Sequence, residues 1–142
     1  MIRVFLDSSV LFSAAYSSRG HSRDLVIMAA REEFTAVISH IVVDEVRRNL
    51  IEIDPELAVY LDLVLEAIPF EFVRPSRQDV VGAAKHVALK DAPIVAAAKR
   101  RKVDLLVTLD KKHLLGKPAL AKFVGAEIVT PKEAIALIKG LN

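Results

Sequence analysis

The chain has 142 residues, of which 53% are hydrophobic and 27% charged, a balance typical of one globular domain rather than a disordered segment. It has no cysteine, which excludes a disulfide framework, cysteine-ligated zinc, iron–sulfur clusters and cysteine catalysis. The net charge of +2 is compatible with a nucleic-acid ligand but does not by itself argue for one. We expect residues 1–142 to form a single domain.

The N-terminal run Met1–Asp7 does not resemble a signal peptide, because its apolar stretch is short and ends in a carboxylate. No apolar stretch approaches the roughly 20 residues that a membrane span needs. We therefore expect a cytoplasmic protein that does not enter the membrane.

Short apolar runs rich in β-branched residues alternate with longer segments of helical period, which is the pattern of a parallel α/β sheet. The expected strands are Ile2–Leu6, Phe34–Ile38, Phe70–Val73, Asp104–Val107 and a short fifth, Glu127–Val129. The expected helices are Val10–Tyr16, Ser22–Arg31, His40–Ile51, Pro55–Ala67, Arg77–Leu89, Ala92–Arg101 and Pro131–Leu141. The alternation predicts a three-layer α/β/α fold with a central parallel sheet of four or five strands.

Acidic residues follow two of the predicted strands. Asp7 comes directly after the first strand, and Asp110 lies just beyond the fourth. Ligands of an open parallel sheet bind beyond the carboxyl ends of the strands, so these carboxylates are expected at one edge. Their mutual repulsion is offset when a divalent cation lies between them. Taken singly, either residue is as often a turn residue or a helix N-cap.

Two predicted helices add acids near this edge. Because residues of a helix advance by about 100°, Glu45 lies at the margin of the apolar face and can reach a cleft, whereas Asp44 points away. Asp91 opens a helix that has Pro93 in its first turn, where proline is tolerated. A solvated acid for Glu45 and a simple cap for Asp91 are the plainer interpretations. The combination favours a shared site, because all four acids have a route to one edge.

Four segments, in this order, resemble the motifs of the PIN-domain family. They are Asp7–Leu11, Ser39–Arg47, Asp91–Ala98 and Leu105–Leu114, and together they span most of the chain. Two positions depart from the family's pattern. Ser9 stands where many members have Asn, so a hydroxyl would orient a metal-bound water less strongly than an amide. Leu109 stands where many have Gly, so the turn must form without positive φ.

The resemblance implies a metal-dependent ribonuclease that cleaves RNA phosphodiester bonds with a metal-activated water. The implied catalytic and metal-binding residues are Asp7, Glu45, Asp91 and Asp110. Asp7 and Asp91 would be direct ligands, while Glu45 and Asp110 would be ligands or would position metal-bound water. Oxygen ligands independently suit Mg²⁺ or Mn²⁺ rather than zinc. The residues expected to orient these carboxylates by hydrogen bonds are Ser8, Ser9 and Thr108.

Cations near the acids are expected to bind the phosphates of RNA without sequence preference. The candidates are Lys90, Lys111, Lys112 and Arg47, with His113 beside them. The run Lys99–Lys102 is more simply explained as a helix end that favours positive charge. With 6% aromatic residues and no tryptophan, recognition would rest on the RNA backbone and shape rather than on base stacking.

The resemblance leaves the partners and two other readings open. PIN proteins of this size include VapC-type toxins, so a small antitoxin protein and a homodimer are expected partners beside RNA, although other members stand alone. One alternative is a catalytically silent PIN-fold binding module. The other is a receiver or phosphatase-type phosphoryl-transfer domain. It is less favoured because Ser9 stands where a dehalogenase-type site needs a second aspartate, and a receiver needs a further acid near Asp7.

Overall fold

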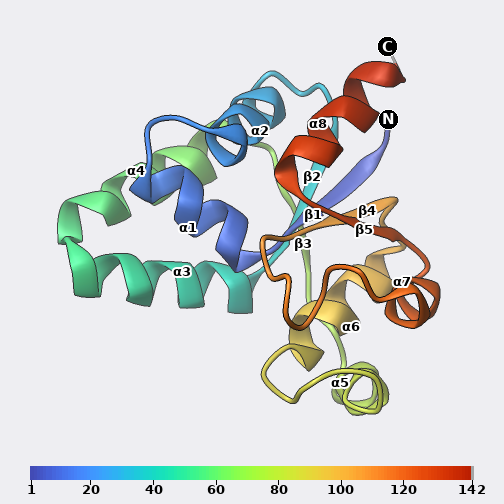
Figure 1. Ribbon diagram of the computed structural model, residues 1–142. Helices are drawn as coiled ribbons and strands as arrows, with labels where there is room; N and C mark the ends of the chain where they lie inside the picture. Colours follow the sequence, from blue (N-terminus) through green and yellow to red (C-terminus); the bar gives the residue numbers. More distant parts are fainter. Residues whose placement is uncertain (142) are drawn as a thin grey trace.

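The computed structural model describes residues 1–141 and is built around a five-stranded parallel sheet (Figure 1). The strands are β1 (Arg3–Leu6), β2 (Thr35–Ser39), β3 (Glu71–Val73), β4 (Leu105–Val107) and β5 (Glu127–Val129). They lie in the order β3-β2-β1-β4-β5. The central strand β1 is covered on both faces: Phe5 is fully buried and pairs with Val37 of β2 and Leu106 of β4. Such burial explains why the sequence of β1 is continuously apolar.

Helices cover both faces of the sheet. They are α1 (Ser8–Tyr16), α2 (His21–Ala30), α3 (His40–Ile53), α4 (Pro55–Ala67), α5 (Arg77–Ala83), α6 (Ala92–Arg101), α7 (Pro118–Val124) and α8 (Pro131–Gly140). One group contains α1, α2, α4 and α8, and the other contains α5, α6 and α7 (Figure 1). Helix α3 starts directly after β2 and packs on α1 and α4. This arrangement confirms the predicted three-layer α/β/α fold.

Two elements differ from the sequence-based expectation by more than two residues at an end. Helix α5 ends at Ala83 instead of Leu89, and the chain continues in turns. Val80, Ala84 and Val87 still pack against the core at helical spacing, which explains the overlong prediction. Helix α7 was not predicted. It has seven residues and ends at Gly125, whose φ of 78° favours glycine.

The sheet determines where the functional residues meet. Leu6 of β1 pairs with Val107 of β4, and the next residue, Asp7, donates its backbone N–H to the Val107 carbonyl at 3.0 Å. The loops after β1 and β4 therefore start side by side at the carboxyl edge. Within residues 1–141, no helix combines the length and the apolar character needed to cross a membrane.

Candidate active site

A pocket of about 860 Å³ opens at the carboxyl edge of the sheet. It is called the acidic pocket here, and its charged lining residues are Asp7, Glu45, Glu52, Lys90, Asp91 and Asp110. All four acids expected from the sequence thus line one cavity. Five carboxylates against a single lysine give the pocket a strongly negative charge, which favours a cation inside it.

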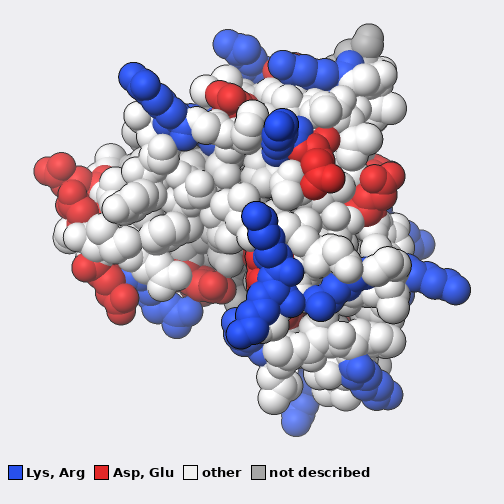
Figure 2. Space-filling model, in the orientation of Figure 1, with Lys and Arg blue, Asp and Glu red and all other residues white. Residues whose placement is uncertain are grey.

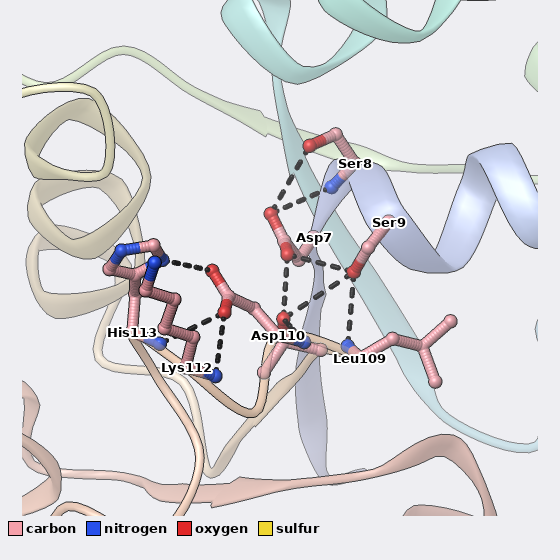
Figure 3. A network of polar contacts seen from close by, with 8 residues as sticks. Asp7, Ser8, Ser9, Leu109, Asp110, Lys112 and His113 are labelled. Carbon is pink, nitrogen blue, oxygen red and sulfur yellow. Dashed lines mark hydrogen bonds and ion pairs between the residues drawn. The ribbon is translucent and has the colours of Figure 1, made fainter.

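Asp7 lies between β1 and α1, is only 4% exposed and accepts hydrogen bonds on both carboxylate oxygens (Figure 3). Its Oδ1 accepts from the backbone N–H of Ser8 at 2.8 Å and is 3.3 Å from Ser8 Oγ. Its Oδ2 accepts from Ser9 Oγ at 2.9 Å and from Thr108 Oγ1 at 2.7 Å. A carboxylate has about four acceptor positions, so these contacts fix its orientation. Asp7 is therefore both a helix cap and a pocket residue.

The hydroxyls of Ser9 and Thr108 connect Asp7 to the loop after β4. Ser9 Oγ accepts from the backbone N–H of Leu109 at 3.0 Å, and Thr108 Oγ1 accepts from that of Asp110 at 3.1 Å. Ser9 thus binds the carboxylate and the loop at once. The non-glycine residues with positive φ in the described chain are elsewhere, so the turn at Leu109 forms without the conformation that favours glycine.

Glu45 projects from α3 into the acidic pocket, where its Oε1 accepts from Ser8 Oγ at 3.2 Å. The preceding residue, Asp44, is exposed, as the helical projection indicates. Ser39 fixes the start of α3 by accepting the backbone N–H of Val42 on its side chain at 3.3 Å. Glu52 was not predicted, although its spacing of seven residues from Glu45 places both on one face of α3.

Asp91 precedes α6 but does not cap it with its side chain. The residue is 7% exposed, and its Oδ2 is buried without a hydrogen-bond partner in the described part of the chain. Burial raises the pKa of Asp91; Lys90 and His113 oppose this rise, and the charges of Asp110 and Asp7 add to it. An unsatisfied buried oxygen is costly. The arrangement therefore points to a ligand that pairs with this oxygen.

Asp110 is held by the turn that follows it. Its Oδ1 accepts from the backbone N–H groups of Lys112 at 3.0 Å and His113 at 2.9 Å, and its Oδ2 lies 3.3 Å from His113 Nδ1 (Figure 3). Burial acts to raise the pKa of Asp110, but the contacts from His113 and Lys112 outweigh it and lower the pKa overall.

One atom each from Asp91, Asp110 and His113 lies within 4.8 Å of the other two, a spacing that can hold a metal ion. The donor set of the pocket fits a hard divalent cation, because it is dominated by carboxylates and includes Asp91, whose Oδ2 has no hydrogen-bond partner in the described chain. From the sequence, His113 was expected only to bind phosphate. Its i,i+3 spacing from Asp110 was the signal for a ligand role.

Three of the four predicted phosphate-binding residues lie in or near the acidic pocket, and the fourth, Arg47, does not line it. Lys90 lines the acidic pocket, and Lys111 and Lys112 are exposed on the segment after Asp110. Figure 2 shows Lys and Arg side chains gathered over the segment after β4, with acidic side chains along α3 beside them. Arg47 is not among the residues that line the pocket; it forms an ion pair with Asp62 of α4 at 2.7 Å.

Comparisons with known proteins agree with this architecture. The family model described as PIN domain matches residues 3–112. A solved structure of PAE2754 from Pyrobaculum aerophilum has a TM-score of 0.67 and 18% sequence identity, covering 98% of this chain and 96% of that one. A toxin–antitoxin complex from Klebsiella pneumoniae has a TM-score of 0.60 and 22% identity, covering 90% of this chain and 97% of that one.

At these identities the structural similarities show the fold alone. No curated protein matches the chain. The family match rests on the sequence itself and extends from β1 to the turn after Asp110, so it includes the segments that carry all four predicted acids. Because it covers well over half of the residues, this chain belongs to the PIN-domain family.

Proposed function

We propose that the protein is an endoribonuclease that uses Mg²⁺ or Mn²⁺ to cleave phosphodiester bonds of RNA. PIN domains are generally nucleases. The family match therefore argues against the alternative of a receiver or phosphatase-type phosphoryl-transfer domain. One observation carries the proposal: Asp91, whose buried Oδ2 has no hydrogen-bond partner among residues 1–141, lines a pocket together with four other carboxylates. A divalent cation would satisfy this oxygen and offset the repulsion between the acids.

The cation would be held by Asp7, Glu45, Asp91 and Asp110, with His113 as a further candidate ligand. When bound, it would supply a nucleophilic water and stabilise negative charge on the scissile phosphate. Asp91 offers its free oxygen directly. Asp7 offers Oδ1, where the 3.3 Å contact from Ser8 Oγ is the weakest of its four hydrogen bonds. If the cation takes Oδ1 of Asp7, the Ser8 hydroxyl can donate its proton to Glu45 alone and keep the Glu45 carboxylate oriented.

The remaining hydroxyls would keep the acids in place during the reaction. Ser9 and Thr108 hold Oδ2 of Asp7 and the backbone of the loop that carries Asp110. Lys90, Lys111 and Lys112 would bind substrate phosphates around the pocket. Since these contacts read the backbone rather than the bases, cleavage should depend on RNA shape more than on sequence.

We further propose that the protein is the toxin of a toxin–antitoxin pair, acting in the cytoplasm as a homodimer with a small antitoxin protein as its partner. The fold that it shares with the Klebsiella pneumoniae toxin–antitoxin complex supports this role. The role would be tested by co-purifying the protein with the product of a small neighbouring reading frame and asking whether that product inhibits cleavage.

The neighbouring acids Asp44 and Glu45 provide a matched test of the nuclease. Labelled single-stranded RNA would be incubated with each protein in Mn²⁺ and in EDTA. We expect Asp44→Asn to cleave like the wild type, because Asp44 is exposed and outside the pocket. Glu45→Gln and Asp7→Asn should lose roughly 100-fold or more of the Mn²⁺-dependent rate with the fold intact. Wild-type cleavage by Glu45→Gln would refute the assignment.

A catalytically silent PIN-fold binding module is the second candidate. It is favoured by the hydrogen bonds from Ser8 N–H, Ser9 Oγ and Thr108 Oγ1, which satisfy both carboxylate oxygens of Asp7 without a cation. Calorimetric titration separates the two functions. A nuclease should bind Mg²⁺ or Mn²⁺ and lose this binding in Asp91→Asn, whereas a silent module should show no saturable heat with either ion.

A further inference from the structure

A second pocket, of about 410 Å³, adjoins the acidic pocket and has the opposite charge. It is called the basic pocket here, and its lining residues are Lys85, His86, Val87, Ala88, Lys112, His113 and Lys117. Three lysines and two histidines thus face one cavity, and no carboxylate is among the described residues that line it. Such a surface favours an anionic ligand.

The basic pocket begins where the acidic cluster ends. His113 lines the basic pocket, and its Nδ1 lies 3.3 Å from Oδ2 of Asp110. The same histidine belongs to the group with Asp91 and Asp110 whose donor atoms lie within 4.8 Å of one another. In Figure 3, His113 and Lys112 lie on the side of Asp110 away from Ser9. An extended ligand can therefore contact both pockets by passing His113.

The wall formed by the turn after α5 is held in place from two sides. The backbone N–H of His86 donates to the carbonyl of Ala83 at 2.9 Å. The His86 ring stacks on Phe123 of α7 with ring centroids 3.9 Å apart. Lys99 of α6 in turn donates to the Phe123 carbonyl at 2.7 Å and lies over its ring. The pocket is thus lined by the turns after α5 and the loop after β4, and α6 and α7 support its wall through Lys99 and Phe123.

We infer that the basic pocket binds a backbone phosphate of single-stranded RNA adjacent to the phosphate at the acidic pocket. This inference rests on the proposed function. The acidic pocket, with five carboxylates and one lysine, repels a phosphodiester until a cation is bound. Affinity for the strand must therefore come from positive charge beside it. Lys85, Lys112 and Lys117 supply that charge, and the strand runs from Asp110 past His113 toward α7.

The test measures binding apart from cleavage. Fluorescence anisotropy of labelled oligouridylate, titrated in EDTA, would compare the wild type with the double variant Lys85→Glu/Lys117→Glu. Both lysines are exposed and lie outside the acidic pocket. Each lost phosphate contact reduces the salt dependence of binding, so the slope of the logarithm of the association constant against the logarithm of salt concentration should become shallower by about 1.4 for two contacts. At about 0.1 M salt this change corresponds to about 25-fold weaker binding. Mn²⁺ binding by calorimetry should be retained.

Lys139→Glu is the control for charge reversal elsewhere on the molecule, because this lysine lies on α8 and lines a different pocket; the charge change per residue is the same as in the double variant. It should keep most of the affinity. Equal affinities in the double variant, the control and the wild type would overturn the basic pocket, even if the wild type cleaves RNA. Binding that falls only in the double variant, in a protein with no cleavage, would refute the nuclease while supporting this pocket. A wild type that binds no oligouridylate would overturn the inference.

Discussion

The contribution of Asp91 to the stability of the fold depends on what fills the acidic pocket. Its carboxylate is buried, one oxygen has no hydrogen-bond partner within residues 1–141, and burial together with Asp110 and Asp7 raises its pKa. A pKa that is higher in the folded chain than in the unfolded chain stabilises the fold at low pH. That contribution is lost as pH rises from the ordinary aspartate value, about 3.9, through the folded-state pKa.

Replacing Asp91 by Asn should therefore stabilise the cation-free protein at neutral pH. In EDTA at pH 7 we expect the thermal midpoint of Asp91→Asn to exceed that of the wild type by a few degrees, corresponding to about 1 kcal/mol. The advantage should shrink below pH 4, where both forms are neutral at this site. Circular dichroism at several pH values measures it, with Asp44→Asn as an exposed control. A variant less stable than the wild type at pH 7 would contradict this account.

The sequence indicates where a side chain lies when backbone geometry alone decides its position. Asp7 and Asp110 follow adjacent strands, and helical projection separates Glu45 from Asp44. The prediction was incomplete where the outcome depends on which neighbour a long side chain meets. Arg47 pairs with Asp62 on α4, a contact set by packing between helices that no local pattern encodes.

At the scale of elements, Thr108 links the end of β4 to the end of β1. The residue is fully buried, donates to Asp7 Oδ2 at 2.7 Å and accepts the backbone N–H of Asp110 at 3.1 Å. Thr108→Val keeps the shape but leaves that N–H unsatisfied and removes one donor from Asp7. Losing a partner for a buried polar group costs about 1–3 kcal/mol.

We therefore expect Thr108→Val to be less stable than the wild type by about 1–3 kcal/mol in urea unfolding. Its Mn²⁺-dependent cleavage should fall by roughly 10-fold to 100-fold, as for other groups that orient metal-binding carboxylates. Thr108→Ser, which retains the hydroxyl, should recover most of both properties. Equal stability and equal cleavage in Thr108→Val and Thr108→Ser would show that the hydroxyl does not link the ends of β1 and β4.

The elements that sequence reasoning located well are those with a strong local signal at each end. Helix α4 begins at Pro55 behind the capping residue Asp54, and its observed bounds equal the predicted ones. Helix α7 also has Pro118 at its start and Gly125 at its end, but two buried residues over seven positions give almost no periodicity. The length of α5 could not be read from periodicity, because its apolar spacing continues through the turns after Ala83.

For the whole molecule, the distribution of charge is more informative than its sum. The formal net charge is only +2, yet five carboxylates line one pocket and three lysines line the next. Both pockets draw on the loop after β4, which carries Asp110, Lys112 and His113. Separation of charge over so short a distance suits a ligand that is itself a polyanion bound together with a cation.

Cation binding should consequently stabilise the whole fold. A ligand that binds only the folded state adds about 2.7 kcal/mol at 100 times its dissociation constant, or roughly 10 °C in thermal midpoint for a chain of this size. The midpoint of the wild type should rise with the logarithm of Mn²⁺ concentration. Asp44→Asn should show the same rise.

Asp91→Asn should show almost none of it, because it lacks the free carboxylate oxygen, although it starts from the higher midpoint in EDTA. Sodium chloride at equal ionic strength controls for screening of the repulsion between carboxylates, which salt weakens without occupying a site. An equal Mn²⁺ shift in Asp91→Asn and the wild type would place the ion elsewhere on the molecule. The acidic pocket would then hold carboxylates that repel one another without binding a metal ion.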